Sequence, residues 1–420
     1  MLVTVVMPSF NQAGFIERSV RSVLAEQGVS WELIIMDGGS SDGTQTLLHR
    51  LAQEADGRLH WISEADRGPA HAVNKAMALA RGSVVGWLNS DDVYLPGAIE
   101  RAVQALDAHP EWLMVYGHGQ HIDTCDQVIG NYPTYGPDTP IQVFADGCFI
   151  CQPTVFFRKT MVDILGGLDE KLKTAFDFEW WLRLFTRYPK RVGFVDAVQA
   201  GSRLHGAGLT LGQRETVIRE GMQLVTRYLG ACPLHWFKTY MNEVLAEYPQ
   251  GRQIDDLKTH LRAFANMVAD CLTAADQEEL SGLLENDARI QLALPDACLQ
   301  VYPDGWLPAR SALRIRCRDR IWRRVEIRGR HISKVNVPLR LEFRSPNGRV
   351  HIHRIKKRGP FSLQIKLPAP SDLPVSWIFS IDAQGGFVPR EHDPESDDGR
   401  ELVCKIDSIR LHTTKMLFMG

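Results

Sequence analysis

The stretch Trp87-Leu88-Asn89-Ser90-Asp91-Asp92 indicates the fold class of this chain. It is an apolar run that ends in two adjacent carboxylates, and an earlier apolar run, Leu33-Ile34-Ile35-Met36, ends in Asp37. Acids just past strand ends lie where open α/β sheets bind their ligands. Two neighbouring carboxylates fit a packed core poorly, because unpaired buried charge is costly, but they suit a divalent cation shared with phosphates. The pattern predicts the metal–diphosphate site of an enzyme.

Segments of strand and helix character alternate on both sides of this stretch. The expected strands lie at residues 3–7, 33–36 and 83–88, and the expected helices at residues 15–27, 44–55 and 70–80. In the first helix, Ile16, Val20 and Val23 recur at helical spacing and mark the inner face. Such alternation predicts an α/β fold with a mostly parallel sheet flanked by helices.

The pattern changes twice toward the C-terminus. Residues 213–300 have helical periodicity, with segments at 217–229 and 254–271, and predict a helical linker or subdomain. The last part has short alternating strands bounded by Pro and Gly, which predict a β-sandwich. We therefore expect a catalytic α/β domain over 1–212, the helical segment, and an accessory β-sandwich domain over 301–420.

Composition limits the class of protein. The chain has 420 residues, with 48 Lys and Arg against 50 Asp and Glu, so its total charge favours no polyanion partner. No apolar run reaches the roughly 18–20 residues of a membrane-spanning helix. The N-terminus lacks a basic leader and is interrupted by Pro8, which disfavours a signal peptide. The eight cysteines are scattered, and Cys148 and Cys151 have no second pair to complete a zinc site. We expect a cytoplasmic protein.

Basic residues are concentrated in one region. Residues 310–358 contain 17 Lys and Arg against three acids. The solvated faces of alternating strands explain such a region without any function. The alternatives are peripheral docking on anionic lipid headgroups at the inner face of the membrane, and binding of an acidic glycan. RNA-binding and helix-turn-helix signatures are absent, so we expect no nucleic-acid partner.

Six motifs, in one order, resemble those of the family 2 glycosyltransferases, which are inverting enzymes with a GT-A fold. They cover roughly the first 210 residues and are Val5-Val6-Met7-Pro8-Ser9-Phe10-Asn11, Met36-Asp37-Gly38-Gly39-Ser40-Ser41-Asp42-Gly43-Thr44, Asp66-Arg67-Gly68 with Asn74-Lys75, Leu88-Asn89-Ser90-Asp91-Asp92, Phe176-Asp177-Phe178-Glu179-Trp180-Trp181-Leu182-Arg183 and Arg203-Leu204-His205. The resemblance implies transfer of a sugar from a nucleotide diphosphate sugar, most often UDP-linked, to a hydroxyl, which turns an α-linked donor into a β-glycoside. The implied acceptor is a cell-surface polysaccharide or a lipid-linked glycan.

The same resemblance implies a nucleotide site. In the family, the acid matching Asp37 binds the base and the residue matching Phe10 packs against it, and aromatic–base stacking is worth roughly 1–3 kcal/mol. The implied donor-binding residues are Pro8, Phe10, Asn11, Asp37, Gly38, Asp66, Arg67, Asn74 and Asp91. A tight turn with a helix cap at Asp37, and a surface ion pair at Asp66-Arg67, would explain these residues without a ligand.

The resemblance also implies a metal site. Asp92 matches the acid that binds the metal most directly, Asp91 the one that contacts ribose or a metal-bound water, and His205 a loop that closes over the diphosphate and in some relatives ligates the metal. Mn²⁺ or Mg²⁺ suits such hard ligands and would neutralise the leaving diphosphate. A helix N-cap at the acids and a merely hydrogen-bonded His205 are the structural alternatives.

Asp177 aligns with the catalytic base of the family. A base works best when burial lifts its pKa toward neutrality, and the flanking Phe176, Phe178 and the following tryptophans supply an apolar setting. Where the family often has an acid before the base, this chain has Phe176, so Glu179 is a rival base. Asp177 as the cap of a helix at residues 178–188 is the structural alternative.

Two other classes of protein remain as alternatives. One is a carbohydrate-binding or scaffold protein in which the transferase half has lost turnover. The other is a nucleotidyltransferase, although the Gly-rich, basic phosphate loop expected near its N-terminus is missing. Donor hydrolysis separates them, because a scaffold releases no nucleotide diphosphate and a nucleotidyltransferase makes pyrophosphate.

Overall fold

A computed structural model describes residues 1–247, 256–294, 296–316, 322–332, 337–367, 376–393 and 395–413. The chain forms two compact units, Met1–Trp236 and Phe237–Gly420. The helix α8 (Arg214–Leu229) belongs to the first of these units. The three-part division that we expect from the sequence stays a prediction.

A mixed β-sheet forms the centre of the N-terminal unit, all of which is described. Its strand order is β3-β2-β1-β4-β8-β6-β9-β5, and β7 pairs with β6. The strands are β1 (Leu2–Ser9), β2 (Ser30–Asp37), β3 (Leu59–Ser63), β4 (Val84–Trp87), β5 (Val93–Tyr94), β6 (Met114–Ile122), β7 (Val128–Asn131), β8 (Phe156–Arg158) and β9 (Val192–Arg203). The first four strands in the sequence are parallel, as are β6 and β9. The carboxyl ends of β2, β1 and β4 therefore lie side by side at one edge of the sheet.

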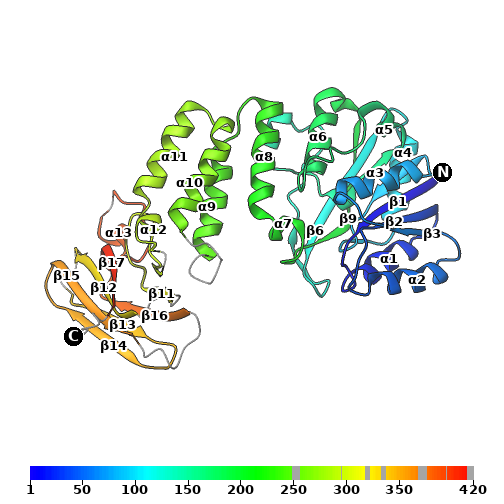
Figure 1. Cartoon of the computed structure of the whole chain (residues 1–420). Helices are drawn as coiled ribbons and strands as arrows, with labels where there is room; N and C mark the ends of the chain where they lie inside the picture. The colour runs from blue at the N-terminus through cyan, green and yellow to red at the C-terminus, as the bar shows by residue number, and fades with distance from the viewer. Residues whose placement is uncertain are drawn as a thin grey trace, which may run out of the picture. The chain divides into compact units, whose positions relative to one another are not determined.

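Helices cover both faces of this sheet (Figure 1). They are α1 (Ile16–Leu24), α2 (Thr44–Glu54), α3 (Pro69–Leu79), α4 (Ala98–Ala108), α5 (Thr160–Leu165), α6 (Phe176–Arg187), α7 (Leu209–Gly212) and α8. Val3, Val5 and Met7 of β1 share a core with the apolar faces of α1, α2 and α4, while α3 packs on β1 and β2. The burial of β1 on both faces explains its unbroken apolar sequence. The predicted α/β class is confirmed.

The C-terminal unit combines helices with antiparallel sheets. Its described elements are α9 (His235–Glu247, which begins at the end of the first unit), α10 (Leu257–Val268), α11 (Ala274–Asn286), α12 (Ala288–Gln291), α13 (Pro389–His392), β10 (Ala297–Leu299), β11 (Arg310–Arg316), β12 (Trp322–His331), β13 (Leu339–Arg344), β14 (Val350–Ile355), β15 (Gly359–Lys366), β16 (Ser376–Gln384) and β17 (Lys405–Thr413). Within the described residues, one sheet has the order β10-β11-β16-β13-β14 and the other β15-β12-β17.

Both of these sheets contribute to one core. Leu313, Leu341 and Phe379 of the first sheet and Val325 and Ile365 of the second are buried together. Two antiparallel sheets around a common core match the predicted β-sandwich. The predicted helix at 254–271 corresponds to α10 and the short turn that follows it, and its residues 254–255 lie outside the described part of the chain.

No helix in the described residues has both the length and the apolar character of a membrane span. Cys148 and Cys151 are free thiols.

Candidate active site

Three loops converge next to the end of β1. A Cβ placed on Gly38 would lie 2.9 Å from Asp66 Oδ2 and 3.2 Å from the ring of Phe10. Phe10 is 59% exposed, which is unusual for a large aromatic residue and leaves it accessible to a ligand. Phe10, Gly38 and Asp66 therefore form one surface, and the missing side chain of Gly38 keeps it open.

Asp37 is buried beneath this surface at the end of β2. It accepts hydrogen bonds from Ser40 N (3.0 Å), Ser40 Oγ (2.5 Å) and Ser63 Oγ (2.6 Å). Asn11 N in turn donates to Ser40 Oγ at 2.7 Å. An ionised carboxylate has about four lone-pair sites, so these three bonds leave one for a further donor. Asp37 fixes the loops and can still accept a hydrogen bond.

Asp91 and His205 face each other beyond the end of β4. Asp91 Oδ2 lies 3.0 Å from His205 Nε2, and both side chains are largely buried. The ring of His205 also packs on Phe15, with 4.6 Å between centroids. A carboxylate oxygen and an imidazole nitrogen at this separation are suitable donors for Mn²⁺ or Mg²⁺.

Asp92 lies deeper than Asp91. Its Oδ1 accepts from Arg203 N at 2.8 Å and its Oδ2 from Asn89 Nδ2 at 3.2 Å. Burial, followed by the neighbouring charge of Asp91, raises the pKa of Asp92. Asp92 is thus the more deeply buried of the two acids, and its expected role as the most direct metal ligand stays a prediction. Asp92 holds the loop and Asp91 presents the accessible carboxylate.

No group of three or more His, Cys, Asp and Glu side chains among the described residues could hold a metal by itself. Mg²⁺ is often held by only one or two protein ligands together with substrate phosphates. Asp91 and His205 are the pair that could supply such ligands.

Asn89 and Arg203 hold the acidic loop in place. Asn89 accepts from Trp87 Nε1 at 3.1 Å and donates to Gln152 Oε1 at 2.7 Å, besides its bond to Asp92. The buried Arg203 donates from Nε to the carbonyl oxygen of Asp91 at 2.6 Å. Sequence reasoning assigned no role to either side chain, because only the tertiary contacts distinguish them from ordinary loop residues.

Asp177 lies in the first turn of α6, and its Oδ1 accepts from Phe178 N at 2.7 Å. Burial raises the pKa of Asp177 to about 6. Its charge and that of Asp92 both act on the buried Cys151, adding to the effect of burial in raising the pKa of that thiol. Trp87, at the end of β4, stacks on Phe176 with 5.9 Å between centroids. Asp177 and the acidic loop therefore border the same region.

Glu179 is engaged elsewhere. Tyr228 Oη donates to its Oε1 at 2.6 Å, and Arg183 forms an ion pair with its other oxygen. This buried cluster stabilises the packing of α6 against α8, and it leaves Asp177 as the more available carboxylate of the two.

Two of the predicted donor-binding residues take part in a different contact. Asn74 donates from Nδ2 to Leu168 O and to Glu170 Oε1, both at 3.0 Å, and accepts from Leu168 N at 2.9 Å. Arg67 forms an ion pair with Glu170. These contacts attach α3 and the loop before it to residues 168–170.

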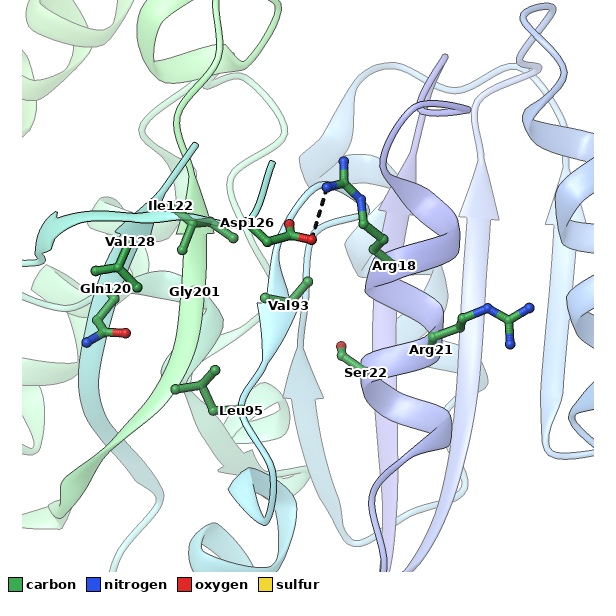
Figure 2. Close-up of a pocket in the computed structure, with 10 residues that line it drawn as sticks. All are labelled: Arg18, Arg21, Ser22, Val93, Leu95, Gln120, Ile122, Asp126, Val128 and Gly201. Carbon is green, nitrogen blue, oxygen red and sulfur yellow. Dashed lines mark hydrogen bonds and ion pairs between the residues drawn. The ribbon is translucent and has the colours of Figure 1, made fainter. Parts of the chain in front are cut away.

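A cavity of about 360 Å³ lies between α1 and the strands β5, β6 and β9 (Figure 2). Apolar walls from Val93, Leu95, Ile122 and Val128 line it, and Figure 2 shows Arg18 reaching Asp126 at its rim. None of the predicted site residues lines this cavity. It is separate from the surfaces described above.

Comparisons with known proteins give one family-model match and several similar proteins. The model of the family "Glycosyl transferase family 2" matches residues 4–165. An uncharacterized glycosyltransferase of Nostoc sp. is 24% identical over 242 residues, which are 54% of this chain and 74% of that protein. Chondroitin synthase of Escherichia coli is 25% identical over 249 residues, 58% of this chain and only 35% of that protein. The solved structure of S. aureus TarS 1-349 in complex with UDP-GlcNAc matches this chain with a TM-score of 0.48 and 13% sequence identity. The match covers 76% of this chain and 97% of that one.

Proposed function

We propose that the chain transfers a sugar from a UDP-linked donor to a glycan hydroxyl with inversion. The match of residues 4–165 to the family 2 glycosyltransferase model and the likeness to an uncharacterized glycosyltransferase support this proposal. The acceptor in this proposal is a cell-surface polysaccharide or a lipid-linked glycan. Likeness to a chondroitin synthase over part of its length supports a polysaccharide. The observation that carries the proposal is the placement of Asp37, Asp91 and Asp177 around the carboxyl edge of one sheet.

The nucleotide occupies the surface formed by Phe10, Gly38 and Asp66 in this proposal. The exposed ring of Phe10 stacks on the base, and Asp37 accepts a hydrogen bond from it. Pro8 and Asn11 set the backbone of the adjoining loop. Arg67 and Asn74 act indirectly, because their side chains hold residues 168–170.

Asp91 and His205 hold the divalent cation, and Asp92 fixes the loop that carries Asp91. When bound, a cation at this position offsets the negative charge that develops on the leaving diphosphate. Support for the pair comes from the 3.0 Å separation of their ligand atoms.

Asp177 removes the proton from the acceptor hydroxyl. The acceptor oxygen forms a bond to the anomeric carbon from the face opposite the diphosphate while the bond from that carbon to the phosphate oxygen breaks. The proton goes to Asp177, and its pKa of about 6 keeps the carboxylate ionised near neutral pH yet basic enough to accept it.

Turnover of a panel of nucleotide sugars with Mn²⁺, followed by NMR of the product, tests the proposal. We expect release of nucleoside diphosphate, a β-linked product, loss of turnover on chelation, and a loss of at least a hundredfold in Asp177→Asn. Release of pyrophosphate, an α-linked product, or full activity of Asp177→Asn would contradict it.

A further inference from the structure

The helix that carries Asp177 begins without a cap of its own. Its N-cap residue is Ala175, which has no side-chain acceptor for the free N–H groups of the first turn. The backbone N–H groups of the three residues before the helix donate instead to Glu220, a residue of α8. Glu220 is only 5% exposed.

The carboxylate of Glu220 accepts four hydrogen bonds from three consecutive residues. Its Oε1 accepts from Lys173 N at 2.9 Å, and its Oε2 accepts from Thr174 N (2.9 Å), Thr174 Oγ1 (2.8 Å) and Ala175 N (3.0 Å). A negative charge at this end of a helix is also favoured by the helix dipole. Glu220 thus fixes the backbone immediately before α6 in a single conformation.

Asp177 depends on this arrangement. Its own carboxylate is held against Phe178 N in the first turn, two residues after the last amide that Glu220 binds. If Glu220 were absent, the three released amides would need new acceptors, and the start of α6 and its carboxylate would lose their fixed position. An error of about 1 Å in the position of a reacting group can cost roughly a hundredfold in rate.

We propose that Glu220 is a positioning residue for catalysis, which acts by fixing the start of the helix that carries Asp177. This inference rests on the proposed function of Asp177 as the base. Glu220 should not affect binding of the nucleotide sugar, because the surface of Phe10, Gly38 and Asp66 lies on other elements.

The chain offers a matched control. Glu26 is also 5% exposed, and its carboxylate accepts from Gly97 N at 2.9 Å and Ile99 N at 3.0 Å at the start of α4. It caps a helix across space as Glu220 does, but α4 carries none of the proposed site residues. Glu26→Gln therefore reports the effect of losing such a cap on the fold alone.

The experiment compares Glu220→Gln and Glu26→Gln in the full chain, well below both unfolding transitions. We expect both variants to lose stability, but only Glu220→Gln to lower kcat, by at least tenfold, with the KM for the donor within twofold of the unchanged protein. Equal kcat in the two variants, or a rise in donor KM that accounts for the whole loss, would overturn the proposal.

Hydrogen–deuterium exchange of the same proteins gives a readout that does not need turnover. Glu220→Gln should speed exchange over residues 173–178, whereas Glu26→Gln should affect residues 97–99 only. Unchanged exchange at Asp177 and Phe178 in Glu220→Gln would overturn the positioning role even if the variant were inactive. Absence of turnover in the unsubstituted chain, with the expected exchange pattern, would instead reject the proposed function and keep the effect of Glu220 on α6.

Discussion

Gly38 shows how one missing side chain can shape a binding surface. A Cβ at this position would be 2.9 Å from a carboxylate oxygen of Asp66, so alanine must displace Asp66 or Phe10. We expect Gly38→Ala to raise the donor KM about tenfold, equivalent to about 1.4 kcal/mol, with little change in kcat. Steady-state kinetics checks this. Gly14→Ala is the control, since no atom lies within 4 Å of a Cβ there, and an equal effect in both variants would contradict the prediction.

Protonation of Asp177 should lower the activity of the protein and raise its stability. Its pKa in the folded protein, about 6, lies above the ordinary value of 3.8, so the folded state binds the proton more tightly than the unfolded state. The free energy of unfolding therefore rises as the pH falls from about 6 toward 4, by at most about 3 kcal/mol from this group. The titratable groups around Asp177 are Tyr132, Cys148 and Cys151, whose thiol and hydroxyl pKa values are themselves raised by burial.

We therefore expect Asp177→Asn to abolish transfer while raising the free energy of unfolding at pH 7 by about 1–3 kcal/mol, as measured by urea denaturation. The exposed acid Asp163 of α5 provides the control, because Asp163→Asn should change stability by less than about 0.5 kcal/mol. If Asp177→Asn instead lowered the free energy of unfolding, then burial of the Asp177 carboxylate would not destabilise the folded protein.

The pH profile of kcat should follow the same group. Activity should fall as the pH drops through about 6, because the base becomes protonated and can no longer accept the acceptor's proton. A rate profile between pH 4.5 and 8 at saturating donor measures this. An acidic limb centred near pH 4 would mean that the base titrates like an exposed carboxyl group.

At the scale of elements, the strands and helices with strong periodicity were predictable. The expected helices at 44–55 and 70–80 match α2 and α3 within one residue at each end, because their apolar residues recur at helical spacing. The strand β3 was not predicted, since it is short and only one of its five residues is buried. The antiparallel insertion of β8 between β4 and β6 also gives no local signal, because strand order depends on tertiary pairing.

The same limit applies to the candidate site. Motifs located Asp91, Asp92, Asp177 and His205 in the sequence, but which acid faces a ligand depends on its neighbours. The amide of Arg203 lies 111 residues from Asp92 in the sequence, and the contact between them decides that Asp92 is the inner carboxylate. No sequence motif indicated a role for Glu220, because its partners are backbone amides of a segment far away in the chain.

At the scale of elements, Asn74 of α3 can be tested for its role: it either binds the donor or stabilises the fold. Its three hydrogen bonds to Leu168 and Glu170 tie this helix to residues 168–170. If it supports the fold, Asn74→Ala should lower the free energy of unfolding by about 1–3 kcal/mol and leave the donor Kd within twofold. Denaturation and donor titration measure the two effects. A large loss of donor affinity in a stable variant would place Asn74 in the nucleotide site.

At the scale of the whole molecule, the positive charge of the β-rich unit suggests a surface contact. In the sheet formed by β15, β12 and β17, Arg324 lies directly opposite Lys366 on one side and His412 on the other. Like charges opposite one another disfavour folding, so an anionic partner would stabilise the pair of Arg324 and Lys366, whereas His412 lies 3.4 Å from Glu326. The partner that we propose is an anionic lipid surface near a lipid-linked acceptor, and an acidic glycan is the alternative.

The full chain should bind vesicles that contain phosphatidylglycerol more tightly than vesicles of phosphatidylcholine alone. We expect the double variant Arg324→Gln/Lys366→Gln to bind roughly thirtyfold more weakly, from about 1 kcal/mol for each charge near an anionic surface. Cosedimentation measures this. The pair Arg330 and Asp407 on the same sheet allows a charge-balanced control, Arg330→Gln/Asp407→Asn, which should bind as before. Competition by a soluble acidic polysaccharide, without vesicle binding, would favour the glycan.

Arg203 ends β9 and clamps two otherwise separate loops. Its guanidinium joins the carbonyl oxygens of Asp91 and Asp123 and the carboxylate of Asp126. The two carbonyl oxygens do not titrate. Burial raises the pKa of Asp126, but its hydrogen bonds to Arg203 and Arg18 lower it by more, so the clamp persists to acidic pH. Acidification should therefore silence the enzyme by protonating its base while Arg203 still holds the carbonyl oxygen of Asp91.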